Sequence, residues 1–210
     1  APVYDVSLGV YEVANRYCPS SRDVYYRRVI KAKSEANGAM RRGKLYHEVL
    51  AEQLVRAKML IYKNGVGGWG TSVEILPVSV EEILSRYRAD FSAEELPEVR
   101  SNVQTIIDFE CARINARVQE VLIKQPYIGV DSLVSLAIPV VVEQKLDGTF
   151  LGLSPNLSCD AYVLSEPMVV DLKFGEKQKF HRLTTTGYAL AMEAINEFPV
   201  NLGCLIYVQM

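Results

Sequence analysis

The chain has 210 residues, of which 49% are hydrophobic and 23% are charged. This length allows one large domain or two small ones, and the composition excludes a disordered or fibrous chain. The formal net charge of -2 argues at first against a nucleic-acid-binding protein, because such domains are usually basic. Residues 16–58, however, hold 11 Lys and Arg against 4 Asp and Glu, a net charge of +7, and the rest of the chain has a net charge of -9. A basic segment is therefore joined to an acidic body.

The sequence indicates a soluble, cytoplasmic protein without a membrane segment. Its longest strongly apolar stretch, residues 133–142, has about half of the ~20 residues that cross a bilayer. No charged and then apolar leader opens the chain.

Up to about residue 124 the apolar residues recur with the period of a helix. The spacing predicts a short helix over 22–33 and an amphipathic helix over 45–61 that Asn64-Gly65 ends. The glycine-rich stretch 65–70 is typical of a mobile loop.

Two capping boxes follow in the sequence. Ser79 with Glu82 predicts the start of a helix that runs through Arg88, and Ser92 with Glu95 predicts the start of a second helix. The second helix is long, and its apolar residues between 99 and 121 share one face.

After residue 126 the pattern favours strands, so the chain is predicted to be an α/β protein. Asp147-Gly148 is a typical dipeptide of a tight hairpin turn. The strands are predicted over 132–144, 149–153, 157–164, 168–174 and 202–208, with a helix over 179–197.

The strand pair over 157–174 contains charged residues in apolar surroundings. Asp171 and Lys173 are two apart, so they project from the same face of their strand, and a hairpin would bring Asp160 beside Asp171. Two carboxylates with an ammonium suit a hard divalent cation, Mg²⁺ or Mn²⁺, and an activated water. The alternative is a structural Asp–Lys pair on a solvent-facing strand.

Two further features are compatible with such a site. His47 lies three residues before Leu50 on the predicted helix, so it turns toward the core side. It is either a third metal ligand or a core histidine. In the segment from Arg16 to Lys44, cations alternate with tyrosines. The cations could bind a phosphate backbone and the tyrosines could stack on unpaired bases. The alternative is a solvated helix face, which would show the same pattern.

A series of short patches runs in a fixed order from residue 17 to about residue 191. The patches are Tyr17-Cys18-Pro19, Arg22-Asp23-Val24-Tyr25, Arg27-Arg28-Val29, Gly43, His47-Glu48, Glu143, Asp147-Gly148, Leu151-Gly152-Leu153-Ser154, Asp160-Ala161, Asp171-Leu172-Lys173 and Gly187-Tyr188-Ala189-Leu190-Ala191. In this order the chain resembles the RecB-like nucleases of the PD-(D/E)xK superfamily. Within that superfamily it is similar to the CRISPR-associated Cas-four exonucleases, above all their archaeal Csa-one branch.

The resemblance implies a fold, a site and an activity. The fold is a restriction-endonuclease-like (RecB-type) mixed sheet flanked by helices, with an N-terminal helical region and an iron–sulfur subdomain. The metal ligands are His47, Asp160, Asp171 and the Leu172 carbonyl, and the catalytic residues are Asp160, Asp171, Lys173 and Tyr188. The activity is metal-dependent 5′ to 3′ cleavage of single-stranded DNA in CRISPR spacer acquisition, with adaptation proteins such as integrase subunits as partners.

On this basis the chain divides into three regions. Residues 1–42 form the basic part of an iron–sulfur and DNA-binding region, residues 43–125 the helical region with His47, and residues 126–210 the nuclease core. The predicted DNA contacts are the basic and aromatic residues Arg22, Tyr25, Arg27, Arg28, Arg41, Arg42, Lys44, Lys179 and Arg182. Tyr25 has an alternative role as an anchor of its helix to the core.

The cysteines and the site motifs depart from the family in part. Cys18 matches the first iron–sulfur ligand, but no cluster of three cysteines follows the last strand, and Cys204 is favoured as a core residue over a ligand. The first acid follows Cys159 where relatives have proline, and Thr184 stands where the helix motif usually has glutamine.

Two other classes of function stay open beside the enzyme. One is a catalytically inactive nucleic-acid-binding subunit of an adaptation complex, and the other is a structural partner in such a complex.

Overall fold

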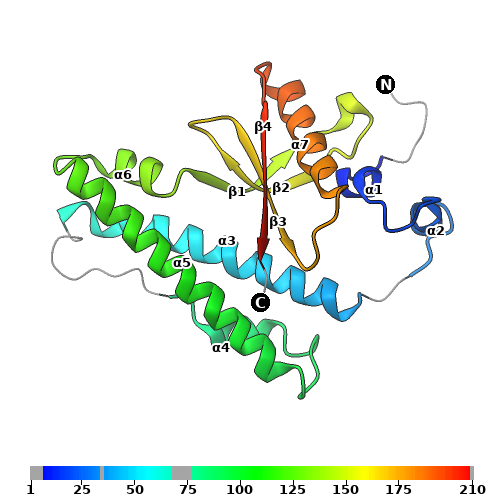
Figure 1. The fold of residues 1–210 in the computed structure, drawn as a ribbon, viewed down its shortest axis with the longest axis horizontal. Coiled ribbons are helices and arrows are strands. Elements are labelled where there is room, and N and C mark those ends of the chain that lie inside the picture. Colours follow the sequence, from blue (N-terminus) through cyan, green and yellow to red (C-terminus); the bar gives the residue numbers. More distant parts are fainter. Residues whose placement is uncertain (1–6, 34–35, 68–76, 209–210) are drawn as a thin grey trace. The chain divides into compact units, whose positions relative to one another are not determined.

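The computed structural model describes residues 7–33, 36–67 and 77–208 (Figure 1). Two compact units form, one of residues 1–36 with 141–209 and one of residues 37–140. The predicted α/β class is confirmed, because a four-stranded mixed sheet is combined with helices. The three predicted functional regions stay a prediction, since contacts alone define these units. Among the described helices, none is long and apolar enough to span a membrane.

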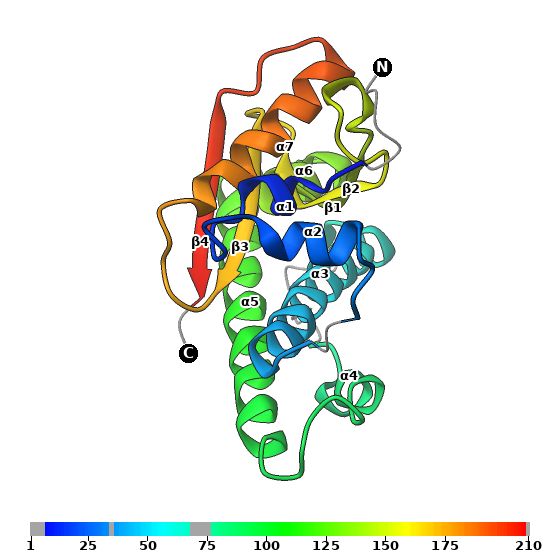
Figure 2. The ribbon, with the colours of Figure 1, turned by 90° about the vertical axis from the view of Figure 1, so that its right-hand side faces the viewer.

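The unit of residues 37–140 is helical. It consists of α3 (Gly38–Asn64), α4 (Val80–Arg86), α5 (Leu96–Lys124) and α6 (Val130–Ala137). Helices α3 and α5 pack along each other, and α6 packs against both (Figures 1 and 2). Their core contains Ile61, Ile114, Val118 and Leu133, none of which is exposed. The helical periods predicted for 45–61 and 99–121 are therefore confirmed.

The ends of these helices follow the predicted signals. Helix α3 ends at Asn64, and Gly65 with φ 66 follows it. Ser79 Oγ accepts a hydrogen bond from the Glu82 N–H at 3.3 Å, and α4 ends two residues earlier than predicted. Ser92 and Glu95 exchange two hydrogen bonds, of 3.0 and 3.3 Å, directly before α5. From residue 68 onward the predicted mobile loop lies outside the described residues.

The strand predicted over 132–144 is wrong in its first half. Residues 130–137 form α6, in which Leu133, Val134 and Ala137 are buried. Val134 and Ala137 follow Leu133 by one and four positions, which is the spacing of a helix face, although the Val and Leu content favours a strand. Pro139 then pushes the residue before it, Ile138, out of the helical conformation, and β1 begins at Val140.

The other unit contains the sheet and the helices around it. Its elements are α1 (Val10–Ala14), α2 (Arg22–Arg28), β1 (Val140–Leu146), the 3₁₀ turn η2 (Thr149–Leu151), β2 (Leu157–Val163), β3 (Met168–Phe174), α7 (His181–Asn196) and β4 (Leu202–Val208). The strand order is β1-β2-β3-β4. Strands β2 and β3 form an antiparallel hairpin, and α7 crosses over to bring β4 parallel to β3 (Figure 1). Helix α2 is shorter than predicted.

The tight hairpin turn predicted at Asp147-Gly148, and the strand predicted after it, are also wrong. Asp147 Oδ1 accepts hydrogen bonds from the Thr149 N–H at 2.9 Å and from the Thr149 hydroxyl at 2.7 Å, which starts η2 instead. Gly148 has φ -93, and a Cβ there would lie 2.6 Å from Leu157 and 2.7 Å from Leu153. Close packing, not left-handed backbone, therefore explains this glycine.

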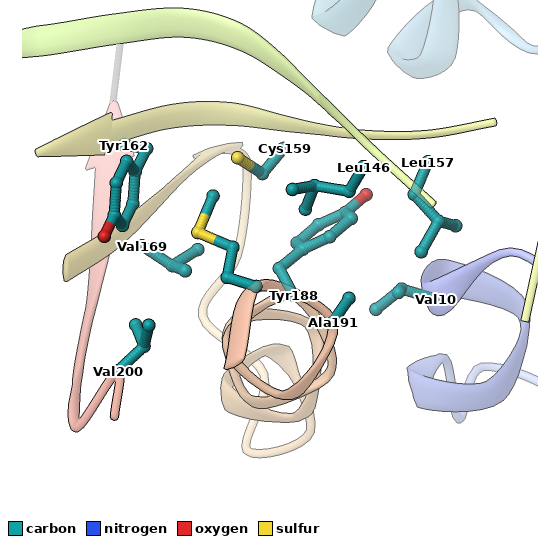
Figure 3. Packing of buried hydrophobic residues seen from close by; sticks show 10 residues of the cluster. Val10, Leu146, Leu157, Cys159, Tyr162, Val169, Tyr188, Ala191 and Val200 are labelled. Carbon is teal, nitrogen blue, oxygen red and sulfur yellow. The ribbon is translucent and has the colours of Figure 1, made fainter. Parts of the chain in front are cut away.

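The core of this unit lies between the sheet and α7 (Figure 3). Tyr188, Ala191 and Met192 of α7 pack there against residues of the sheet, including Cys159 and Val169. Helix α1 packs against α7 as well, and a Cβ at Gly187 would lie 2.6 Å from a methyl group of Val10. Helix α7 therefore packs both against α1 and against the sheet whose strands β2 and β3 contain Asp160 and Asp171.

Candidate active site on the acidic hairpin

The hairpin of β2 and β3 brings two carboxylates together. Its ladder pairs Val163 with Met168 and ends with Ala161 opposite Val170. The next position on each strand is Asp160 or Asp171. Beyond the ladder, Asp160 Oδ2 accepts a hydrogen bond from the Leu172 N–H at 2.7 Å. The predicted proximity of the two acids is confirmed, and the side chain of Asp160 is fixed to the strand of Asp171.

Asp171 is 3% exposed and has a charged neighbour on its own strand. Lys173 Nζ lies 2.7 Å from Asp171 Oδ2, as predicted for residues two apart in a strand. Burial raises the pKa of Asp171 to about 6, against the lowering effect of the Lys173 charge, and the nearby charge of Asp160 raises it further. The site thus holds more negative charge than Lys173 compensates.

The oxygens of this hairpin fit a divalent cation. Asp171 Oδ2 is fully buried, and its 2.7 Å contact with Lys173 Nζ is an ion pair that does not fully satisfy the oxygen as a hydrogen-bond acceptor. Hard cations such as Mg²⁺ and Mn²⁺ prefer carboxylate and carbonyl oxygens. Within residues 7–33, 36–67 and 77–208, no three His, Cys, Asp or Glu side chains are grouped as a metal site. The hairpin itself therefore offers two carboxylates and the adjacent backbone of Leu172.

Tyr188 faces the sheet from α7. It is 9% exposed and lies in the core with Leu146 and Leu157 (Figure 3). Burial raises its pKa, and the charges of Asp160 and Asp171 raise it further. The phenol therefore lies within the electric field of both carboxylates and stays protonated at neutral pH.

His47 and its neighbour Glu48 lie on α3, in the other compact unit. His47 is half-buried, between the buried residues Tyr46 and Val49. Glu48 accepts a hydrogen bond from Arg86 at 2.8 Å and another from the Tyr87 hydroxyl, so it connects α3 with the end of α4. The assignment of His47 as a metal ligand stays a prediction.

The four cysteines are free thiols. Cys18, in the turn before α2, is half-buried, and its Sγ lies 3.5 Å from Ser20 Oγ. This hydrogen bond, with backbone N–H groups at the start of α2, lowers the pKa of Cys18, which favours the thiolate that metals bind. Cys204 is half-buried in β4 and pairs with Val170 in register. The iron–sulfur cluster stays a prediction.

Several of the predicted DNA contacts form ion pairs within the chain. Arg28 binds the buried carboxylate of Glu12 through a two-nitrogen fork, with distances from 2.5 to 3.1 Å. Arg27 pairs with Asp23 at 3.0 Å, and Arg42 with Glu95 at 3.3 Å. Exposed side chains without such a pair among the described residues include those of Arg22, Lys179 and Arg182, whereas Lys44 lies 5.7 Å from the ring centre of Tyr87. Tyr25 is 53% exposed.

No local sequence pattern indicates the structural role of His181. His181 belongs to a basic run after β3, which suggests a DNA contact. In the structure its ring is buried and lies between the hydroxyl groups of Tyr17 and Tyr207. Tyr17 is 164 residues away along the chain, so no local pattern could reveal the contact.

Fold and site together define an α/β protein in which a β-hairpin presents two neighbouring carboxylates and a lysine beside a helix tyrosine. The family model of the CRISPR-associated exonuclease Csa1 matches residues 1–210. The chain belongs to this family, which confirms the Csa-one part of the predicted resemblance.

Two relatives with the same description agree with this assignment. The CRISPR-associated exonuclease Csa1 of Saccharolobus solfataricus is 30% identical over 210 residues, which are 99% of this chain and 68% of the relative. That of Thermoproteus tenax is 26% identical over 209 residues, 99% of this chain and 65% of the relative. The chain thus spans about two thirds of the length of both relatives. No solved structure matches it. These relatives support a CRISPR-associated nuclease role.

Proposed function

We propose that this chain is a divalent-metal-dependent exonuclease that acts on single-stranded DNA. The observation that carries the proposal is the hairpin of β2 and β3, which holds Asp160, a buried and incompletely satisfied Asp171, and Lys173 within one small area. The names of the relatives support the exonuclease class. The resemblance to RecB-like and Cas-four nucleases supports single-stranded DNA as substrate, the 5′ to 3′ direction and a RecB-type fold.

Each residue has a distinct task in this proposal. Asp160, Asp171 and the Leu172 carbonyl hold Mg²⁺ or Mn²⁺, and His47 is the fourth ligand. When bound, the metal polarises the phosphoryl oxygen and lowers the pKa of a water molecule. The Lys173 ammonium stabilises the negative charge that develops on the phosphate. The hydrogen bond from the Leu172 N–H keeps Asp160 oriented toward the site. Tyr188 lies within the electric field of both carboxylates and stays protonated, so that its hydroxyl remains a donor.

Cleavage of end-labelled oligonucleotides tests the proposal. Oligonucleotides labelled at the 5′ or 3′ end, with Mn²⁺, Mg²⁺ or EDTA, report metal dependence and direction together. We expect Asp171→Ala and His47→Ala to lose cleavage. Glu166→Gln is the matched control, because Glu166 is an exposed acid at the tip of the same hairpin. Wild-type cleavage by both variants would refute the site.

The inactive-subunit alternative predicts a different result in calorimetry. An active site should bind Mn²⁺ with defined stoichiometry, and Asp171→Ala should abolish that binding. A chain that binds DNA but shows no stoichiometric Mn²⁺ binding would instead be a nucleic-acid-binding subunit. A structural partner would keep its DNA affinity and its salt dependence after Arg22 is replaced by alanine.

We further propose that Cys18 is one ligand of an iron–sulfur cluster and that the protein acts with integrase subunits in spacer acquisition in the cytoplasm. The lowered pKa of Cys18 supports the first part. Full-length protein purified without air should be brown and absorb near roughly 400 nm, as iron–thiolate centres do. Colourless protein would contradict the cluster. Co-purification with the integrase subunits tests the second part.

A further inference from the structure

Four aromatic rings from three distant segments meet in the compact unit that carries the sheet. They belong to Tyr17, Phe180, His181 and Tyr207. His181 is at the centre and is 6% exposed, with Nδ1 2.9 Å from the Tyr207 hydroxyl and Nε2 3.2 Å from the Tyr17 hydroxyl. Its ring stacks on Tyr207, with 5.7 Å between the ring centres and 28° between the planes. Both ring nitrogens therefore connect to tyrosines.

Tyr17 combines high exposure with a fixed orientation. Tyr17 is 66% exposed, yet its hydroxyl is hydrogen-bonded to His181. Its ring also makes an edge-to-face contact with Phe180, with 4.9 Å between the ring centres and 85° between the planes. A hydrogen bond at one end and an edge-to-face contact along the side restrict both side-chain torsions. An exposed ring held in this way can receive a flat partner with little loss of side-chain entropy.

The cluster adjoins the acidic hairpin. Tyr207 of β4 is the register partner of Lys173 of β3, so the two residues are neighbours on adjacent strands. Lys177 Nζ lies 6.0 Å from the ring centre of Tyr207, and the exposed Lys179 and Arg182 flank the start of α7. The proposed catalytic lysine therefore has Tyr207 of the aromatic cluster as its neighbour, and Lys177 lies beside that ring.

His181 acts in this cluster as a neutral connector. Burial lowers its pKa, and the charge of Lys173 lowers it further. A neutral imidazole donates through one nitrogen and accepts through the other, so it can bond both tyrosine hydroxyls at once. This arrangement differs from the phosphate-binding cation that the basic run suggests.

We propose that Tyr17 is a stacking platform for an unpaired DNA base next to the catalytic hairpin, and that His181 is the residue that positions it. Stacking of bases on aromatic side chains, together with cations along the backbone, is the usual basis of single-strand binding. The inference rests on the proposed function and adds a named contact for the DNA strand. It predicts a preference for single strands, because a base inside a duplex is already stacked between its neighbours on both faces.

Binding measured without cleavage tests this proposal separately from the nuclease reaction. Fluorescence anisotropy of a labelled single-stranded oligonucleotide in EDTA gives the affinity of the full-length protein. Tyr17→Leu should bind about tenfold more weakly, because the base loses its aromatic stacking partner. Tyr17→Phe keeps the ring and should bind within about threefold of the unaltered protein. Tyr127→Leu is the control, because Tyr127 is a fully exposed tyrosine outside the cluster.

The salt dependence separates stacking from charge. Tyr17→Leu should leave the slope of log K against log salt unchanged, whereas Lys177→Ala should reduce it by about one ion. Affinity of Tyr17→Leu within twofold of the unaltered protein, with an unchanged melting temperature, would overturn the proposal. So would the absence of binding to single strands by the unaltered protein.

Two measurements examine the contact and the positioning role directly. Photocrosslinking of an oligonucleotide containing 5-iododeoxyuridine, followed by mass spectrometry, should give an adduct on Tyr17 in the unaltered protein. The absence of this adduct among recovered crosslinks would count against the platform. His181→Phe should weaken binding less than Tyr17→Leu and add nothing to it in the double variant. Additive effects would mean that His181 does not act through Tyr17.

A failure of this inference is distinguishable from a failure of the proposed function. Weak binding by Tyr17→Leu together with no metal-dependent cleavage by the unaltered protein would support the platform and refute the nuclease. Normal binding by Tyr17→Leu together with metal-dependent cleavage would refute the platform and support the nuclease.

Discussion

Glu12 and Asp171 are both buried carboxylates of the same compact unit, with 4% and 3% of their surface exposed. Glu12 accepts one hydrogen bond from the Gly9 N–H at 2.9 Å and three from the Arg28 guanidinium. Burial alone would raise the pKa of Glu12, but the hydrogen bonds and the charge of Arg28 outweigh it, and the pKa is lowered. The chain itself therefore satisfies the charge of Glu12.

Asp171 differs from Glu12 in the quality of its partner. Lys173 is a single point charge 2.7 Å from Asp171 Oδ2 and does not fully satisfy this oxygen, and the charge of Asp160 repels that of Asp171. Burial of a charge without full compensation is unfavourable, and the raised pKa of about 6 reflects this. From this comparison we infer that the satisfied carboxylate of Glu12 serves the structure, and we propose that the incompletely satisfied carboxylate of Asp171 binds an external cation.

The largest expected effect is on the rate of DNA cleavage, which should depend on Asp171 through its charge. Asp171→Asn should lower the rate of DNA cleavage by at least about 10³-fold, because the charge stabilisation by a bound metal contributes several kcal/mol. In EDTA the free energy of unfolding should stay equal or increase, because an uncompensated charge is removed from the interior. Initial rates and urea unfolding of the same preparations check this. A large loss of stability would show that Asp171 has the structural role of Glu12.

Removal of Arg28, the partner of Glu12, should instead lower the stability of the fold. Arg28→Met leaves the Glu12 carboxylate buried and unpaired, and should lower the free energy of unfolding by about 3 kcal/mol. This value is at the lower end for a buried pair, because the Arg28 side chain is 39% exposed. Urea unfolding measures it, with Arg22→Met as an exposed control that should change within about 0.5 kcal/mol. Equal effects of both variants would mean that Arg28 is not the structural partner of Glu12.

The two acids should also differ in the sign of their pH dependence. The pKa of Asp171 is raised from 3.8 to about 6, so the folded state holds its proton longer than the unfolded state. Its unfavourable contribution is therefore absent below about pH 4 and grows to about 2–3 kcal/mol as the pH rises through 6. Relative to Asp171→Asn, the unaltered protein in EDTA should lose stability over this range.

Mn²⁺ provides the control for that measurement. A cation that binds the ionised carboxylate should reverse the loss of stability at pH 7 and have little effect at pH 4. If the stability difference between the two proteins is the same at both pH values, the carboxyl group of Asp171 does not change its ionisation on folding.

The parts of this site that the sequence predicts are those with local causes. Asp160 and Asp171 are 11 positions apart on two consecutive strands, so a hairpin brings them together, and Lys173 follows by the period of a strand. The Ser92 capping box likewise lies within four residues. In α6 the composition of residues 132–137 favours a strand, whereas the spacing of the buried residues Leu133, Val134 and Ala137 is that of a helix.

Contacts between segments that are distant in the sequence cannot be predicted from a local pattern. Arg28 has the features of a DNA contact in a basic run, and only the fold shows that it pairs with Glu12, 16 residues earlier. The hydrogen bonds of His181 reach Tyr17 and Tyr207, 164 and 26 residues away. Charge and aromatic content predict a surface that binds nucleic acid, but which cations are already paired depends on the tertiary structure.

The smallest effect is expected from Arg28→Lys. This substitution gives Glu12 a lysine partner, as Asp171 has in Lys173. Arg28→Lys keeps a positive charge beside Glu12 but removes the planar fork that donates to both carboxylate oxygens. We expect a loss of about 1 kcal/mol in the free energy of unfolding at pH 7, less than for Arg28→Met, because one charge-assisted hydrogen bond can be kept.

The acid side of the unfolding curve measures the same change independently. The lowered pKa of Glu12 stabilises the folded state above about pH 4.5, and this contribution is lost as the pH falls through the folded-state pKa. In Arg28→Lys the pKa of Glu12 should move back toward its ordinary value, so less stability is lost on acidification. If Arg28→Lys is as stable as the unaltered protein, a single point charge satisfies a buried carboxylate, and the pairing of Asp171 with Lys173 no longer explains why that site should bind a metal.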